Sequence, residues 1–170
     1  VIKPLLKLNN LSLIDTQSSF YQHLLKNWAD KTVGLKPLFG NIPVTDASAE
    51  EISRWVTLFL GVNKEEFLIA GYFGSITQPC LNQEVFDKLK KCADKSNKKL
   101  LICSAGGISD GREKEFLNLN SKSMQIIRLG RLSEFNVSMY LLSLDAGLTG
   151  TPYLLLQKSG SAVSMIEHGL

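Results

Sequence analysis

The sequence predicts an α/β protein, a Rossmann-like three-layer α/β/α arrangement built around a parallel sheet. Short apolar runs alternate along the chain with amphipathic helical patterns, which is the order expected of repeated strand–helix units. Strands buried on both faces of a parallel sheet read as continuous apolar runs, as these do. The 170 residues, 44% hydrophobic and 21% charged, suit one soluble α/β domain or one domain with a piece of another.

The amino-terminal part, residues 1–44, predicts one strand–helix–strand unit followed by a linker, and a domain boundary is expected within 43–48. Trp28 falls on the apolar face of the helix, so we expect it in the core. In order, the expected elements are a strand at 11–14, a helix from about 17 to 28, a strand at 33–38 and a turn or linker at 39–43.

The second part, residues 45–170, opens with a capping box at 48–51, in which a serine and a glutamate satisfy the first N–H groups of a helix. Trp55 lies on the apolar face of that helix and is expected in the core. The elements then expected are strands at 67–73, 100–103, 124–129 and 145–148, helices at 82–94, after 110–113 and from Ser133, a loop at 149–157, and a last helix beginning near 159–161.

Small residues follow the strands of this second part, at 74–75, 104–107, 130–131 and 149–151. Ligands of such folds bind beyond the carboxyl ends of the strands, so we expect these loops to share one edge of the sheet. Gly74 and Ser75 would allow a diphosphate to approach backbone N–H groups, although a simple tight turn explains the same residues. The loop at 104–107 is not a GxGxxG dinucleotide motif, and by itself it is better explained as a flexible connection after a strand.

The segment Lys158-Ser159-Gly160-Ser161 joins a cation, two hydroxyls and a glycine at an expected helix start. The first N–H groups of a helix and its dipole favour a phosphate. The alternative is that Ser159 or Ser161 only caps the helix while Lys158 is solvated, and the spacing does not choose between the two.

Composition excludes several other kinds of function. A net charge of +3 gives no argument for a nucleic-acid partner, and two histidines exclude a histidine-rich metal site. Three cysteines without CxxC spacing fit a reducing compartment. No apolar run reaches the ~20 residues of a transmembrane helix, and no signal peptide is visible. His168, near the end of the last helix, is expected to be structural.

In order and spacing, these motifs resemble the carboxyl-terminal domain of bacterial group-1 type glycosyltransferases with the GT-B fold. The resemblance covers about residues 11–170. It is carried by Asn41-Ile42-Pro43-Val44, Phe73-Gly74-Ser75-Ile76, the segments 101–107, 129–133 and 145–148, and Lys158-Ser159-Gly160-Ser161 running into Glu167-His168-Gly169-Leu170.

The resemblance implies that residues 45–170 bind the nucleotide-diphosphate sugar from which a sugar passes to an unknown acceptor. Residues 1–44 would be the end of the acceptor domain with the interdomain linker, and the remainder of that domain and the last strand would lie outside this chain. By this resemblance, Gly74 and Ser75 lie near the diphosphate, Arg131 and Leu132 flank the nucleobase, and Lys158, Ser159, Gly160 and Ser161 hold the phosphates.

The resemblance further implies no cofactor or metal ion, because helix dipole and basic side chains stabilise the leaving diphosphate. It implies polysaccharide biosynthesis in the cytoplasm, with any peripheral association at the inner membrane residing in the missing domain. The catalytic residues are unknown, since the base is expected outside the chain, and we expect residues 1–170 to bind a nucleotide without catalysing transfer.

Two departures from the family pattern affect this interpretation. Ser164 stands where many sugar-retaining members have the second glutamate of a Glu-x7-Glu motif, and Leu156 lies eight residues before it, so retention or inversion is not assigned. Residues 78–81 replace a common Lys-Gly pair. The alternatives are another nucleotide-sugar enzyme, such as a sugar 2-epimerase, and a non-catalytic flavodoxin-like binding module.

Overall fold

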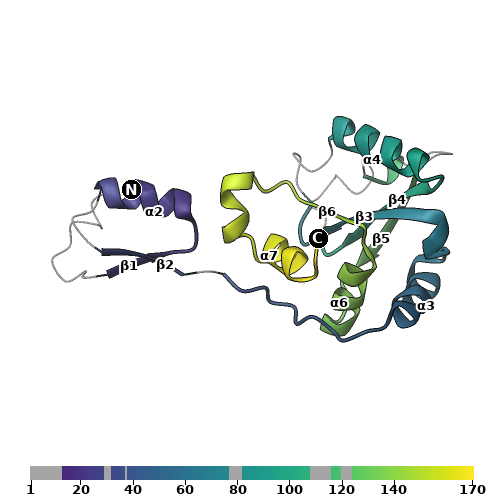
Figure 1. Cartoon of the computed structure of the whole chain (residues 1–170), viewed down its shortest axis with the longest axis horizontal. Helices are drawn as coiled ribbons and strands as arrows, with labels where there is room; N and C mark the ends of the chain where they lie inside the picture. Colours follow the sequence, from purple (N-terminus) through teal and green to yellow (C-terminus); the bar gives the residue numbers. More distant parts are fainter. Residues whose placement is uncertain (1–12, 29–31, 37, 77–81, 108–115, 120–123) are drawn as a thin grey trace.

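The computed structural model describes residues 13–28, 32–36, 38–76, 82–107, 116–119 and 124–170, and shows an α/β protein with two parallel sheets (Figure 1). The smaller sheet pairs β1 (Leu13–Thr16) with β2 (Thr32–Leu35), and α2 (Ser19–Trp28) lies between them in the chain. Residues 38–48, called the linker here, contain no helix or strand and lead to the larger sheet.

The larger sheet has four parallel strands in the order β5-β4-β3-β6. The chain adds β4 and β5 on one side of β3 and then returns to place β6 on the other side. The order of strands therefore reverses between β3 and β6, which makes this the topological switch point of the sheet. The strands are β3 (Phe67–Phe73), β4 (Lys99–Ala105), β5 (Met124–Gly130) and β6 (Ala146–Leu148).

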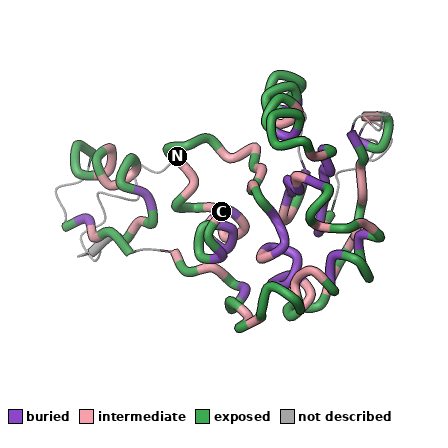
Figure 2. Tube along the Cα trace, turned by 45° about the vertical axis from the view of Figure 1, so that its right-hand side comes forward, coloured by how far each residue is buried: buried purple, intermediate pink, exposed green. Residues whose placement is uncertain are grey.

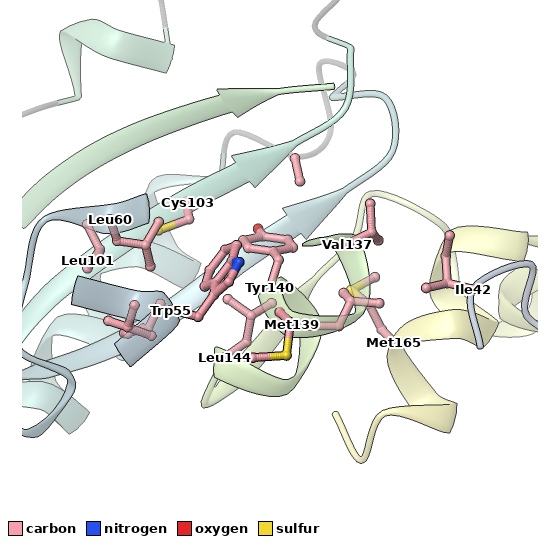
Figure 3. Packing of buried hydrophobic residues seen from close by; sticks show 14 of the residues in the cluster. Ile42, Trp55, Leu60, Leu101, Cys103, Val137, Met139, Tyr140, Leu144 and Met165 are labelled. Carbon is pink, nitrogen blue, oxygen red and sulfur yellow. The ribbon is translucent and has the colours of Figure 1, made fainter. Parts of the chain in front are cut away.

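Helices cover both faces of this sheet, which is consistent with the expected Rossmann-like three-layer arrangement. One face packs on α3 (Ala49–Leu60), α6 (Glu134–Ser143) and α7 (Gly160–Glu167), and the other packs on α4 (Gln83–Lys95). Trp55 of α3 lies beside Tyr140 of α6, with ring centres 6.5 Å apart, in the core of the first face (Figure 3). The expected core position of Trp55 is confirmed, because it is only 5% exposed.

The capping box at the start of α3 is confirmed. The Glu51 backbone N–H donates to Ser48 Oγ at 3.3 Å, and the Ser48 N–H donates to Glu51 Oε2 at 2.8 Å. Two N–H groups that lack partners inside the helix are thereby satisfied, which fixes where the linker ends and α3 begins.

The prediction that Trp28 is in the core is wrong, because its side chain is 42% exposed. Helix α2 contains no buried residue, whereas buried residues are concentrated around the larger sheet (Figure 2). The described part of the smaller sheet has only two strands, and so small a sheet offers too little area to cover a whole helix face.

The expected loop at 149–157 is also corrected, since Tyr153–Lys158 forms a 3-10 helix, η3. Its backbone bonds span three residues, as in the Leu155 N–H to Pro152 O bond of 2.8 Å. Pro152, with its fixed φ, suits the position before such a turn. Other boundaries differ by a few residues: β2 ends at Leu35, and β4 extends through Ser104 and Ala105.

The expected helix start at 110–113, the positions 11 and 12 of the first expected strand, and residues 78–81 lie outside the described residues. Among the helices that the structure describes, none has the length and apolar character needed to cross a membrane.

Candidate functional site

The loops after β3, β4 and β5 meet at one edge of the larger sheet, as expected. The Gly74 N–H donates to Ala105 O at 2.9 Å, and the Gly106 N–H donates to Gly130 O at 2.7 Å. These bonds continue the strand ladder past the ends of the strands and hold the three loops side by side.

Gly74 and Gly106 both have a positive φ at this edge, and neighbouring atoms come so close to them that a side chain would be crowded. Gly106 has φ +123°, and a Cβ atom there would lie 2.4 Å from the carbonyl oxygen of Gly74. Gly74 has φ +96°, and its Cβ would lie 3.2 Å from Cβ of Ser161. The loop after β3 therefore contacts both the loop after β4 and the start of α7.

A cavity of about 300 Å³, the first cavity, opens at the switch point between β3 and β6. Parallel α/β sheets bind ligands at this position, beyond the carboxyl ends of the strands on either side of the reversal. Hydroxyl groups from three different segments reach it: Ser75 after β3, Thr149 and Thr151 after β6, and Ser161 in α7. Its lining consists of Tyr72, Phe73, Ser75, Leu148, Thr149, Gly150, Thr151, Pro152 and Ser161.

The start of α7 is capped by Ser159 and lines the first cavity through Ser161. Ser159 caps the helix, since its Oγ accepts the Ala162 N–H at 3.3 Å. Ser161 lines the first cavity, and its Oγ lies 3.1 Å from Ser159 Oγ. The hydroxyl pair thus places the amino-terminal turn of α7, with its positive dipole end, against the cavity. A Cβ at Gly160 would meet no atom within 4 Å, so packing does not require glycine there.

A second cavity, of about 360 Å³, lies beside the loop after β5. Phe73 lines both the first and the second cavity, which makes the two neighbours. Ile42, Phe73, Leu132 and Val137 give the second cavity apolar surface, while Asn41, Arg131 and Glu134 add polar groups. Its full lining is Asn41, Ile42, Phe73, Gly106, Arg131, Leu132, Glu134 and Val137.

The linker forms one wall of the second cavity because it is bonded to α6 and α7. The Gly40 N–H lies 3.1 Å from both carboxylate oxygens of Glu167. The Thr45 N–H donates to Ser138 Oγ at 2.8 Å, and Ser138 Oγ lies 2.9 Å from His168 Nε2. His168 is buried in this network, in agreement with its expected structural role.

Lys158 is separated from the other residues expected to hold phosphate, because it lines neither cavity. Its ammonium lies 4.1 Å from the centre of the Tyr21 ring, on the side of η3 that faces the smaller sheet. Of the expected site residues, Ser75 and Ser161 line the first cavity, and Arg131 and Leu132 line the second. Gly74 and Ser159 lie next to Ser161, and Gly160 lines neither cavity.

Several lining residues were not expected from the sequence. Phe73 was assigned only to the strand, although the last residue of a strand next to a switch point is placed to face a ligand. Asn41 belongs to a motif of the resemblance but was given no role in binding, and Glu134 was not singled out, since the linker and the start of α6 meet only in the folded chain. The loop with Thr149 and Thr151 was expected at this edge, but the hydroxyls were not singled out.

No protein-family model matches this chain, and no curated protein matches it in a sequence search.

Proposed function

We propose that the two neighbouring cavities bind the nucleoside diphosphate of a nucleotide-sugar donor, and that the chain is the donor-binding part of a glycosyltransferase. The observation that carries this proposal is the position of the first cavity, at the switch point and against the start of α7. A diphosphate is the ligand that matches such a position, because helix N–H groups and hydroxyls donate hydrogen bonds to its oxygens.

The second cavity supports the same proposal by its size and its lining. It combines apolar side chains such as Phe73 and Leu132 with the polar groups of Asn41 and Arg131. A nucleobase has an apolar face and a polar edge, so such a lining fits it. Because Phe73 lies between the cavities, a base in the second and a diphosphate in the first belong to one ligand. The assignment of sugar transfer, and of enzymatic activity itself, rests on the resemblance of the motifs.

The proposal is tested by calorimetric titration of the protein with UDP, GDP, ADP and CMP. We expect one diphosphate to bind, and its identity names the base. Ser161→Asp places a carboxylate at the first cavity and should weaken binding at least tenfold by charge repulsion, since 1.4 kcal/mol already corresponds to about tenfold. Ser161→Ala, which removes only a hydroxyl, should cost a few-fold.

The matched control is Ser53→Asp, which adds the same negative charge in α3, a helix that lines neither cavity. Its affinity should stay close to that of the unchanged protein. If no nucleotide binds, or if Ser161→Asp binds as tightly as Ser53→Asp, the first cavity is not a diphosphate site. The flavodoxin-like binding module would then be the better interpretation.

A further inference from the structure

A third cavity, the junction cavity, lies where the smaller sheet meets η3. It measures about 320 Å³ and is lined by Asp15, Thr16, Gln17, Lys36 and Lys158. All five side chains have polar or charged ends, and none of them lines the first or the second cavity. The walls come from the end of β1, the residue after β2 and the last residue of η3.

Direct hydrogen bonds hold these walls together. Ser18 Oγ donates to Leu154 O at 3.2 Å, and the Ser19 N–H donates to Gln157 Oε1 at 3.2 Å. The start of α2 is thereby bonded to η3 at two points, and Lys158 follows Gln157 directly. The cavity is therefore built by both parts of the chain together.

The charged groups of the junction cavity leave an excess of one positive charge. Lys36 is paired with Asp15, with Nζ 2.6 Å from Oδ2. Lys158 is held in place by the face of the Tyr21 ring, 4.1 Å from its centre, and none of the ion pairs in the described part of the chain includes it. Two ammonium groups and one carboxylate thus line a space that can hold a ligand.

We propose that the junction cavity binds a phosphate group, with Lys158 as its main cation and Lys36 shared between the ligand and Asp15. Ammonium groups form strong charge-assisted hydrogen bonds with phosphate oxygens, and the amide of Gln17 and the hydroxyl of Thr16 can donate further bonds. The origin of this phosphate group rests on the proposed function. If the first cavity holds the donor, the phosphate bound in the junction cavity belongs to the acceptor, the molecule that receives the sugar.

The test is a titration of the whole chain with inorganic phosphate, followed by the backbone amide signals in nuclear magnetic resonance spectra. We expect the signals of residues 15–17 and 158 to shift. Lys158→Gln and Lys36→Gln should each weaken binding about tenfold, the loss expected for one charge-assisted contact. Asp15→Asn should strengthen it a few-fold, because it removes the carboxylate that competes with the ligand for Lys36.

The matched control is Lys88→Gln, which removes the same charge from an exposed lysine of α4 that pairs with Glu84 at 2.7 Å. Lys158→Arg, which keeps the charge and the contact with Tyr21, should retain binding and so separates loss of charge from loss of structure. The proposal is overturned if Lys158→Gln binds phosphate as tightly as the unchanged chain, or if Lys88→Gln loses as much affinity as Lys158→Gln.

Two further experiments complete the test. The first distinguishes this inference from the proposed function, and the second identifies the source of the phosphate. Lys158→Gln should bind the nucleotide with the same affinity as the unchanged chain. Binding at the first cavity is then measured independently of binding at the junction cavity. Glycerol 3-phosphate should bind more tightly than inorganic phosphate if the group belongs to a larger molecule. Equal affinities would assign the cavity to free phosphate and overturn the acceptor assignment.

Discussion

Replacing Gly106 by alanine should destabilise the protein through two effects at one atom. The backbone there has φ +123°, and holding a non-glycine residue in such a region costs about 1–3 kcal/mol. The added Cβ would also lie 2.4 Å from the Gly74 carbonyl oxygen and 2.9 Å from its carbonyl carbon, so the backbone must move. Such overpacking costs about 1–3 kcal/mol in addition. We therefore expect a loss of about 4 kcal/mol in the free energy of unfolding.

Two other glycines separate these effects in a urea denaturation series. Gly130 has φ +67°, but a Cβ there meets nothing within 4 Å, so Gly130→Ala should cost only the conformational strain, about 1–2 kcal/mol. Gly107 has open space around it and no positive φ, so Gly107→Ala should leave stability unchanged or raise it by up to about 1 kcal/mol. In thermal melts the loss for Gly106→Ala corresponds to about 8–16 °C for a chain of this size.

The test is the order of stability of the three variants, in which Gly106→Ala should be the least stable and Gly107→Ala the most stable. If Gly106→Ala is no less stable than Gly130→Ala, the close approach of the loops after β3 and β4 does not constrain this position. Because Gly106 also lines the second cavity, the same substitution should weaken nucleotide binding at temperatures where the variant is still folded.

Three other changes test the core and the start of α3. Ser48→Ala removes the cap of α3 and should lower the free energy of unfolding by about 1 kcal/mol in urea titrations. Ser104→Ala should raise it by about 1 kcal/mol, because the Ser104 hydroxyl is buried without a hydrogen-bond partner among the described residues. Burial raises the pKa of the Cys103 thiol and of the Tyr140 phenol, so both stay protonated in the folded state. In the unfolded chain the thiol loses its proton above about pH 8.5 and the phenol above about pH 10. The free energy of unfolding should therefore fall with rising pH from about 8.5, by roughly 1 kcal/mol per pH unit for each group. Cys103→Ala should remove the part of this fall that the thiol causes.

The order of strands and helices could be predicted from the sequence because each element carries its own local signal. The strand at Phe67–Phe73 was expected with the bounds that the structure shows, since seven apolar residues lie between a polar turn and Gly74. Ser48 and Ser133 cap helices as their positions indicated. The strand order could not be predicted in the same way, because it depends on which side of β3 the chain returns to after β5.

Burial was predicted less well where it depends on how much surface a neighbour offers. Trp28 and Trp55 both have apolar residues at helical spacing around them, yet Trp55 lies under a four-stranded sheet and Trp28 beside a two-stranded one. A periodic pattern indicates which face of a helix turns inward, but the area of the partner decides whether that face is covered.

Lys158 shows the same distinction at the level of the candidate site. Along the chain it precedes Ser159 and Ser161, and a basic residue at a helix start favours a phosphate bound there. In the fold, Lys158 is the last residue of η3, and α7, which carries Ser161, begins two residues later. The Lys158 side chain therefore extends from η3 and not from α7. Tyr21, from a different part of the chain, contacts the ammonium, which lines the junction cavity. Sequence proximity therefore groups Lys158 with Ser161, although the structure places them at different cavities. If the first cavity holds the donor and the junction cavity the acceptor, as proposed, this short segment contacts the donor through Ser161 and the acceptor through Lys158.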